Sequence, residues 1–432
     1  MKIPVTLTLV LAGMAAAACA RTPAPQAALS PSPLLLVFAG DADEADEDFL
    51  AVVDLGNGPT AGRVVASTPI GLKASMPHHM EYALPPPGEL LFMNAHHHEQ
   101  TLLVDVSNSR QPRVAKRLTP PPPFRFTHDY TRLPNGNRLV GFLRSEGASP
   151  QKGDTTSPGG HGGIAEYSAA GDLLRSASAE VAGYQEPIRP YAFAPLLGED
   201  RVVTTSALMM EQSSADVVQI WRYSDFKLLH TIAVPPGAAA DGTPLPGAGK
   251  VPFEPRLMRD GSVLLNAYGC GLYRVTGIAS ERPSISHVYT IQVPDPPSPD
   301  ATRGACGVPA IADNFWIMPV GRAHMLVTLD ISDPARPREV ARFETALDFN
   351  PHWLAADPAS SRLVVGAELG GEQGMLILDL DRATGRLSPA AGIVDADGRP
   401  GYVNLAVNDW PHGATGPAWG HAALFLPPGP QK

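Results

Sequence analysis

The sequence predicts an all-β protein, a seven-bladed β-propeller that forms a single domain. Seven segments share one pattern, in which an apolar strand is followed by a polar turn and a second strand that carries charges. These segments are 48–67, 100–118, 163–178, 218–234, 271–293, 324–343 and 374–392. Hairpin-like stretches such as "FEPRLMRDGSVLLNAYG" lie between them. The pattern therefore returns every 50 to 60 residues, roughly the length of a four-stranded propeller blade.

The composition agrees with this architecture. Of the 432 residues, 41 are glycine and 46 are proline, which favours many short elements joined by turns over long helices. The net charge is −10 and no basic stripe occurs, so nucleic acid is excluded as a partner, because phosphate binding needs dense positive charge. The sequence has no G-x-S-x-G, P-loop or H-E-x-x-H motif, which leaves serine hydrolase, nucleotide-binding and zincin functions without support.

The two ends of the predicted propeller, 34–432, are expected to meet in one blade. The last apolar stretch, "HAALFLPPG" (421–429), would pair with the first strands, "LLLVFAG" (34–40) and "DFLAVVDLG" (48–56). Such sharing closes the ring and removes exposed sheet edges. No domain boundary interrupts the repeat, so we predict one domain.

The N-terminus predicts export. Residues 1–20 contain one lysine, an apolar stretch to about Met14 and small residues around Cys19, whereas a membrane-spanning helix needs roughly 20 apolar residues. Cleavage is expected either after Ala20 or before Cys19, which would then carry lipid. Residues 21–33 form a Pro/Ala/Ser tether. We therefore expect a periplasmic protein, with a lipid anchor as the alternative to the free form. The two remaining cysteines, Cys270 and Cys306, form either a disulfide or two buried thiols.

Histidines recur at one position of the repeat. In a propeller the inner strand of each blade runs along the central channel, so equivalent positions of successive blades face a common space. In four blades a histidine lies eight or nine residues before the turn that ends this strand, namely His79, His128, His352 and His421. The other blades place Pro190, Phe253 or Glu254, and Cys306 there. The four histidine-bearing blades are the first two and the last two, so we expect one arc of imidazoles at the channel mouth.

This arc predicts a metal site. Neutral imidazole suits copper, iron, nickel and zinc, and an all-histidine set leaves coordination positions open for substrate or oxygen. A single histidine before a strand is usually structural or solvated, but four at equivalent positions of adjacent blades favour a metal. His78 adjoins His79 and either binds the metal as a fifth ligand or donates a hydrogen bond to one of the ligands.

Other polar residues are weighed against this arc. The run His96–His98 is expected at the opposite end of the inner strand, on the order of 20 Å away at about 3.3 Å per residue, and therefore outside the site. His324 occupies the matching turn of a later blade. His412 is a reserve ligand. Asp129 and Glu254 lie next to the arc or level with it, and a structural role in pairing is the simpler interpretation for both.

The sequence resembles the selenium-binding protein / methanethiol oxidase family along nearly the whole predicted propeller. The matching pieces include "THDYTRLPNGNRLVGFL", "LVTLDISDPARPREVARF", "NPHWLAADPASSRLVV" and "GPAWGHAALF". The resemblance implies a seven-bladed propeller and, for bacterial members, a periplasmic copper enzyme. Such enzymes convert methanethiol, oxygen and water to formaldehyde, hydrogen sulfide and hydrogen peroxide. By motif match, the histidines near the metal would be His78, His79, His128, His352 and His421. The stretch after His79 lacks the family's cysteine, so the resemblance does not imply selenium binding.

Three functions follow as hypotheses. The first is a copper-dependent periplasmic oxidase of a small thiol, with the thiol and oxygen as its partners. The second is a four-histidine iron oxygenase. The third is a non-catalytic propeller that binds a metal or a partner protein. The bound metal separates the first two, and turnover separates both from the third.

Overall fold

The computed structural model describes residues 1, 33–145, 160–209, 213–293, 305–346, 348–368 and 372–427. Apart from Met1 and Pro33, the predicted export signal and tether lie outside the described residues. Within the described part of the chain, no helix has the length and apolar character needed to cross a bilayer.

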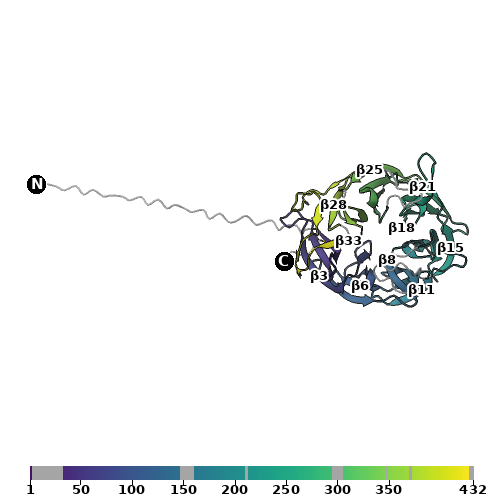
Figure 1. Ribbon diagram of the computed structural model, residues 1–432, viewed down its shortest axis with the longest axis horizontal. Helices are drawn as coiled ribbons and strands as arrows, with labels where there is room; N and C mark the ends of the chain where they lie inside the picture. Colours follow the sequence, from purple (N-terminus) through teal and green to yellow (C-terminus); the bar gives the residue numbers. More distant parts are fainter. Residues whose placement is uncertain are drawn as a thin grey trace.

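Seven antiparallel sheets stand around a central axis, which confirms the predicted seven-bladed propeller (Figure 1). Their inner strands are, in ring order, β33 (Ala418–Leu426), β4 (Pro77–Met80), β8 (Phe124–Arg132), β12 (Pro190–Leu196), β18 (Pro252–Leu257), β22 (Ala310–Ala312) and β26 (Pro351–Ala356). The second strands are β1 (Leu34–Asp41), β5 (Leu91–Ala95), β9 (Arg138–Ser145), β13 (Arg201–Ser206), β19 (Val263–Ala267), β23 (Phe315–Val320) and β27 (Arg362–Ala367). We number the blades 1 to 7 in this order.

The third strands are β2 (Glu47–Asp54), β6 (Gln100–Asp105), β10 (Gly163–Tyr167), β14 (Val217–Arg222), β20 (Gly271–Thr276), β24 (Met325–Asp330) and β28 (Gly374–Leu380). The outer strands are β3 (Val64–Lys73), β7 (Arg113–Leu118), β11 (Leu173–Ser178), β15 (Lys227–Ala233), β21 (Ser284–Thr290), β25 (Arg338–Glu344) and β29 (Leu387–Pro389), and β30 (Tyr402–Asn404) also pairs with β28. Two small hairpins are β16 (Gly237–Ala238) with β17 (Pro244–Leu245), and β31 (Asp409–Trp410) with β32 (Gly413–Ala414).

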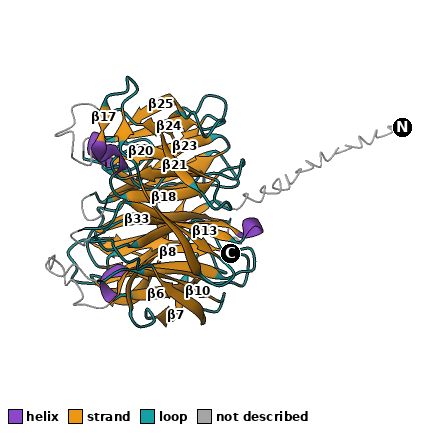
Figure 2. Cartoon of the chain, turned by 90° about the vertical axis from the view of Figure 1, so that its right-hand side faces the viewer, coloured by secondary structure: helices purple, strands orange, loops and turns teal. Residues whose placement is uncertain are grey.

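Short helical turns complete the described structure (Figure 2). They are η1 (His96–His98), η2 (Leu197–Glu199), η3 (Pro246–Gly249) and η4 (Gly321–Ala323). η1 and η4 occupy the same place in their blades, between the second and third strands of blades 2 and 6.

Burial decreases from the second and third strands to the outer strand. All eight residues of β1 are buried, whereas β7 and β11 have no fully buried residue. Second and third strands are covered on both faces by the neighbouring blades, which explains their continuous apolar runs such as "LLLVFA". Outer strands meet water and carry the charges that the sequence pattern showed.

Both ends of the propeller meet in blade 1, as predicted. β33 pairs antiparallel with β1, and Leu36 lies opposite Leu424. This pairing leaves β33 as the inner strand of the blade, so its side chains reach the channel. A second long-range link is the disulfide between Cys270 and Cys306, whose Cα atoms are 5.1 Å apart. Of the two alternatives for these cysteines, the structure has the disulfide, and it ties blade 5 to blade 6.

Candidate metal centre

A break in strand pairing recurs at one level of the channel. In six blades the register between the inner and second strands shifts at this level. The residues at the shift are His78–His79, His128–Asp129, Tyr191–Ala192, Phe253–Glu254, His352 and His421–Ala422. A bulge of this kind turns a side chain out of the regular alternation, and it explains why these residues face one another across the channel. Blade 4 places Tyr191 here, one residue beyond the predicted Pro190.

The five predicted histidines come together. The ring centres of His79 and His128 are 4.1 Å apart, and those of His78 and His79 are 4.4 Å apart. His421 lies 4.6 Å from His78, and His352 lies 5.1 Å from His421. Nitrogen atoms of His78, His79 and His128 all lie within 4.8 Å of one another, which is close enough to surround one ion. The five rings follow the ring order of blades 7, 1, 2 and 3. We call them the histidine cluster.

The hydrogen bonds of the cluster leave nitrogen atoms for a metal. His128 Nδ1 donates to the carbonyl of Tyr191 at 3.0 Å, and His421 Nδ1 donates to the carbonyl of Ala367 at 2.8 Å. A carbonyl only accepts, so the proton sits on Nδ1 and Nε2 keeps its lone pair. The Nε2 atoms of His128 and His421 are buried without a partner among the described residues, and so are both ring nitrogens of His78 and His79.

Burial keeps these imidazoles neutral. The five side chains are between 0% and 6% exposed. Burial lowers the pKa of His352 to about 4 and that of His421 to about 3, where the neighbouring His352 lowers it further. The pKa values of His78, His79 and His128 lie well below 6.5 for the same reason, with neighbouring imidazoles adding to the effect. Neutral imidazole is the form that binds metals, so the donor set fits a metal ion.

Asn94 on β5 holds together the two strands that carry His79 and His128. Its Oδ1 accepts a hydrogen bond from the His79 backbone N–H at 2.7 Å. Its Nδ2 donates to the carbonyls of Thr127 and His128 at 3.0 and 3.2 Å. One amide therefore fixes β4 relative to β8. Sequence reasoning missed this residue, because nothing in the pattern of β5 marks a cross-blade contact.

In the structure, His96 lies near the histidine cluster. Its ring centre lies 5.8 Å from that of His78, and the side chain is 2% exposed. The prediction that this run lies about 20 Å away is wrong, because β5 runs antiparallel to β4 and returns to the end at which β4 begins. Pro77 accordingly pairs with Ala95, directly before His96.

The reserve ligand His412 does not reach the cluster. Its Nδ1 lies 2.6 Å from Ser67 Oγ on β3, the outer strand of blade 1. The β31–β32 hairpin folds beside this outer strand and carries His412 with it. The prediction of a reserve ligand is therefore wrong. His324 follows η4 in blade 6 as expected, and its Nδ1 lies 3.3 Å from the Phe349 carbonyl.

Aromatic and charged side chains lie beside the histidines. The Tyr82 ring stacks on Trp353 at 5.5 Å, and the Arg256 guanidinium lies 4.5 Å from the Tyr82 ring centre. Trp353 is in turn 5.0 Å from His79. Sequence reasoning missed Tyr82 and Arg256. Their signal was a short spacing: Tyr82 follows His79 by three residues, just after β4, and Arg256 follows Glu254 by two residues on β18.

The two carboxylates singled out in the sequence belong to this group. Glu254 Oε2 accepts hydrogen bonds from the Tyr82 hydroxyl and from Arg256, both at 2.8 Å. Asp129 accepts one from Thr131. Burial raises the pKa of Asp129 to about 7, and the charge of Glu254 adds to this shift. Both carboxylates are fully buried, so the arrangement is a polar network inside the channel.

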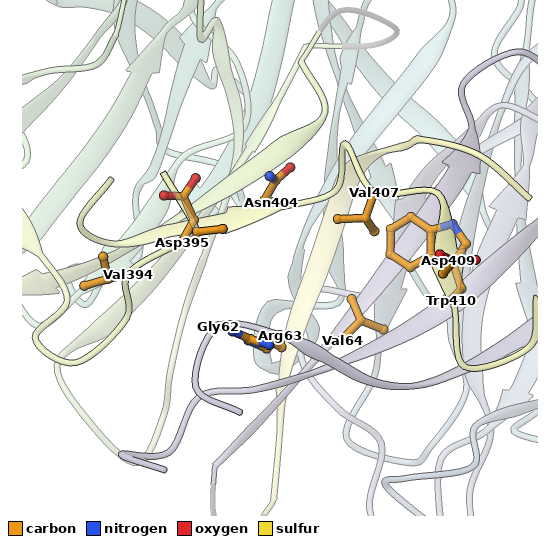
Figure 3. Close-up of a pocket in the computed structure, with 10 residues that line it drawn as sticks. Gly62, Arg63, Val64, Val394, Asp395, Asn404, Val407, Asp409 and Trp410 are labelled. Atoms are coloured by element: carbon orange, nitrogen blue, oxygen red, sulfur yellow. The ribbon is translucent and has the colours of Figure 1, made fainter. Parts of the chain in front are cut away.

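A surface pocket of about 370 Å³ lies between blades 7 and 1 (Figure 3). Arg63 and Val64 line one side, and Val394, Asp395 and Trp410 lie among the residues of the other. Two of its polar groups are already engaged: Asp395 accepts hydrogen bonds from Arg399, and Trp410 Nε1 donates to the Gly416 carbonyl. None of the five histidines lines it. The histidine cluster is therefore the stronger candidate site.

Comparisons with known proteins bear on the fold. No protein-family model matches the chain, and no curated protein is a significant sequence relative. Among solved structures, a hypothetical selenium-binding protein from Sulfolobus tokodaii matches with a TM-score of 0.67 at 14% identity, covering 92% of this chain and 94% of that one. A periplasmic gluconolactonase from Pseudomonas aeruginosa matches with a TM-score of 0.58 at 15% identity, over 92% and 99% of the two chains. At such identities the likeness shows the fold alone.

Proposed function

We propose that this chain is an exported, metal-dependent oxidase of a small thiol, with copper held by the histidine cluster. The observation that carries the proposal is the set of buried imidazole nitrogens without partners. Leaving such groups unpaired costs about 1–3 kcal/mol each, and a bound ion removes that cost. The resemblance to the selenium-binding protein / methanethiol oxidase family favours copper, and the likeness to the solved selenium-binding protein supports a distant link to that family. Iron is the alternative metal.

The residues around the cluster fit this chemistry. Bound copper would supply a Lewis acid and a one-electron redox partner for the thiolate and oxygen. The chain's own part is to orient the imidazoles through the carbonyls of Tyr191 and Ala367 and to exclude water with aromatic rings. The ring centre of Tyr191 lies 3.8 Å from that of His128, and the ring centre of Trp353 lies 5.0 Å from that of His79. Aromatic rings this close to the histidines favour a thiol of very few carbons. The Tyr82 hydroxyl donates a hydrogen bond to the Glu254 carboxylate, and its ring centre lies 6.5 Å from that of His79.

The proposed location is the periplasm. The predicted export signal at 1–20 supports it, and so does the Cys270–Cys306 disulfide, because such bonds persist in oxidising compartments. Lipid on Cys19 would anchor the protein to a membrane.

Metal analysis of the chain purified from a periplasmic preparation tests the proposal. We expect about one copper per chain, together with thiol-dependent oxygen uptake and hydrogen peroxide release when methanethiol is added. The His128→Ala/His352→Ala double variant should lose both. Tyr191→Phe, which keeps the neighbouring ring, is the matched control and should keep the metal.

Other outcomes contradict the proposal in different ways. Bound iron in place of copper would support the four-histidine iron oxygenase. Bound copper without oxygen uptake would leave a metal-binding propeller that does not turn over a thiol. A wild-type chain that takes up no metal, even when copper is supplied, would remove the oxidase altogether.

A further inference from the structure

We propose that the turn His96–His98 is the access route along which a metal ion reaches the buried histidine cluster. The ion would pass from imidazole to imidazole, from the exposed His98 past His97 and His96 to His78. This inference rests on the metal binding proposed above, and it adds a role for residues that neither the repeat nor the family resemblance assigned.

The cluster needs such a route because it is enclosed. Stripping a cation of its water inside a protein is very unfavourable unless ligands replace that water. Aromatic rings stand against three members of the cluster: Trp353 at 5.0 Å from His79, Tyr191 at 3.8 Å from His128, and Phe253 at 6.0 Å from His352. The rings of Trp353 and Phe253 carry no atom that would bind an ion on its way inward. Burial raises the pKa of Tyr191 well above 10, so its hydroxyl stays neutral and is a poor metal ligand.

His78 faces a different neighbour. Its ring centre lies 5.8 Å from that of His96, and His96 lies 6.4 Å from His97. A metal–nitrogen bond is about 2.0–2.1 Å, so two imidazoles that share one ion have ring centres up to roughly 6 Å apart. The two inner steps, from His97 to His96 and from His96 to His78, are close to that spacing. His78 also lies 4.6 Å from His421 and 4.4 Å from His79, so it connects the turn to the remaining ligands.

Burial changes in the direction that an access route requires. His98 is exposed, His97 is half-buried, and His96 is 2% exposed. The turn is held against the backbone at the end of β3, because His97 Nδ1 lies 3.2 Å from the Ala74 carbonyl and His98 Nε2 lies 2.9 Å from the Lys73 carbonyl. Glu99 beside them pairs with Arg125 at 3.0 Å. The rings therefore keep fixed positions between solvent and His78.

Blade 6 provides a matched control. His324 follows η4, the turn equivalent to η1, and is half-buried like His97. Its Nδ1 also lies near a carbonyl, that of Phe349 at 3.3 Å. The inner strand of blade 6 has no histidine, so a metal ion bound by His324 would have no ligand ahead of it.

The experiment follows Cu²⁺ uptake by the chelator-treated full chain. Cu²⁺ quenches tryptophan fluorescence, and Trp353 lies next to His79, so stopped-flow fluorescence reports arrival at the cluster. In the His96→Ala/His97→Ala variant we expect uptake and chelator-driven release to slow together by about tenfold or more. The final copper per chain should equal that of the wild type. His324→Ala should take up Cu²⁺ at the wild-type rate.

A milder variant guards against misfolding. His97→Gln changes a half-buried side chain and should slow uptake by a smaller factor, with an unchanged thermal unfolding midpoint. Wild-type uptake rates in both variants would overturn the access route while leaving the metal centre intact. A loss of bound copper at equilibrium in the His96→Ala/His97→Ala variant would overturn it by making these residues ligands. If the wild-type chain binds no Cu²⁺, the measurement of copper per chain will show it. That result would contradict both the proposed function and the access route.

Discussion

Two parts of the channel wall share the same bulge in the inner strand but differ in the side chains that the bulge turns into the channel. Blades 1, 2, 3 and 7 turn histidines into the channel at the bulge, whereas blades 4 and 5 turn Tyr191 and Phe253 inward at the same level. We call the first set the histidine arc and the second the aromatic arc. On the histidine arc, ring nitrogens are buried without partners in the described part of the chain. On the aromatic arc, Tyr191 packs 4.2 Å from Phe253.

This difference separates the role of the repeat from the role of the side chain. The bulge recurs in six blades, so it belongs to the architecture and does not by itself make a site. The proposed metal site needs histidines at the bulge in adjacent blades, because neighbouring blades bring ring nitrogens within reach of one ion. The aromatic arc supplies packing and encloses the site.

The largest expected effect concerns Trp353, which packs against one histidine of the cluster and against a second aromatic ring. Trp353 is fully buried and contacts His79 as well as Tyr82. Trp353→Ala should lower the free energy of unfolding by about 3–5 kcal/mol, because it removes a large buried ring. Trp353→Phe keeps a ring and should lose less than half of that. Urea unfolding measures both, and equal losses would mean that the ring stack contributes nothing of its own.

Copper should change the free energy of unfolding only through the histidine arc. Copper at 100 times its dissociation constant should raise the free energy of unfolding by about 2.7 kcal/mol, since it binds the folded state alone. His128→Ala should abolish this gain, and Tyr191→Phe across the contact should retain it. Thermal unfolding with copper and with chelator gives the comparison. A gain that survives in His128→Ala would place the ion outside the cluster.

A pair of asparagines tests the two arcs with the same substitution. Asn94 donates to the carbonyls of Thr127 and His128, and Asn266 donates to those of Cys306 and Gly307. Either change to alanine should lower the free energy of unfolding by about 1–3 kcal/mol. Asn94→Ala should weaken copper binding more than Asn266→Ala, by about tenfold, because Asn94 bonds two histidine-bearing strands directly, whereas Asn266 bonds a segment next to one of them. Copper titration distinguishes them, and equal affinities in the two variants would show that Asn94 does not position the ligands.

The smallest effect is a gain in stability on the aromatic arc. The Tyr191 hydroxyl is buried without a hydrogen-bond partner among the residues described. Tyr191→Phe should therefore raise the free energy of unfolding by about 1 kcal/mol. Chemical unfolding of the metal-free protein provides the test, with Tyr130→Phe as the contrast. Tyr130 bonds Thr101 at 2.8 Å, so its loss should destabilise. A destabilised Tyr191→Phe would show that this hydroxyl is satisfied.

The sequence predicted the fold because a propeller repeats its pattern once per blade. Counting residues back from each turn was enough to align His79, His128, His352 and His421, since the repeat fixes their level. The misplaced His96 required a second rule, that an antiparallel neighbour returns to its starting end. The position of His412 depends on a hairpin outside the repeat.

Contacts across the channel were beyond the reach of the sequence. The stack of Tyr82 on Trp353 and the bond from Tyr82 to Glu254 join blades 2, 7 and 5. Trp353 and Glu254 occupy ordinary positions in their strands, and Tyr82 lies just after β4. Their meeting depends on the curvature of the closed ring, which no local pattern encodes.

The closing strand has a consequence for when the site comes into being. His421 lies on β33, the last strand of the described residues, and His78 lies on β4, far earlier in the sequence. Their rings meet only after β33 has paired with β1. A chain that is truncated before β33 lacks the complete cluster. An ion bound between these blades would stabilise the closed ring, and it would bind only to chains that have finished folding.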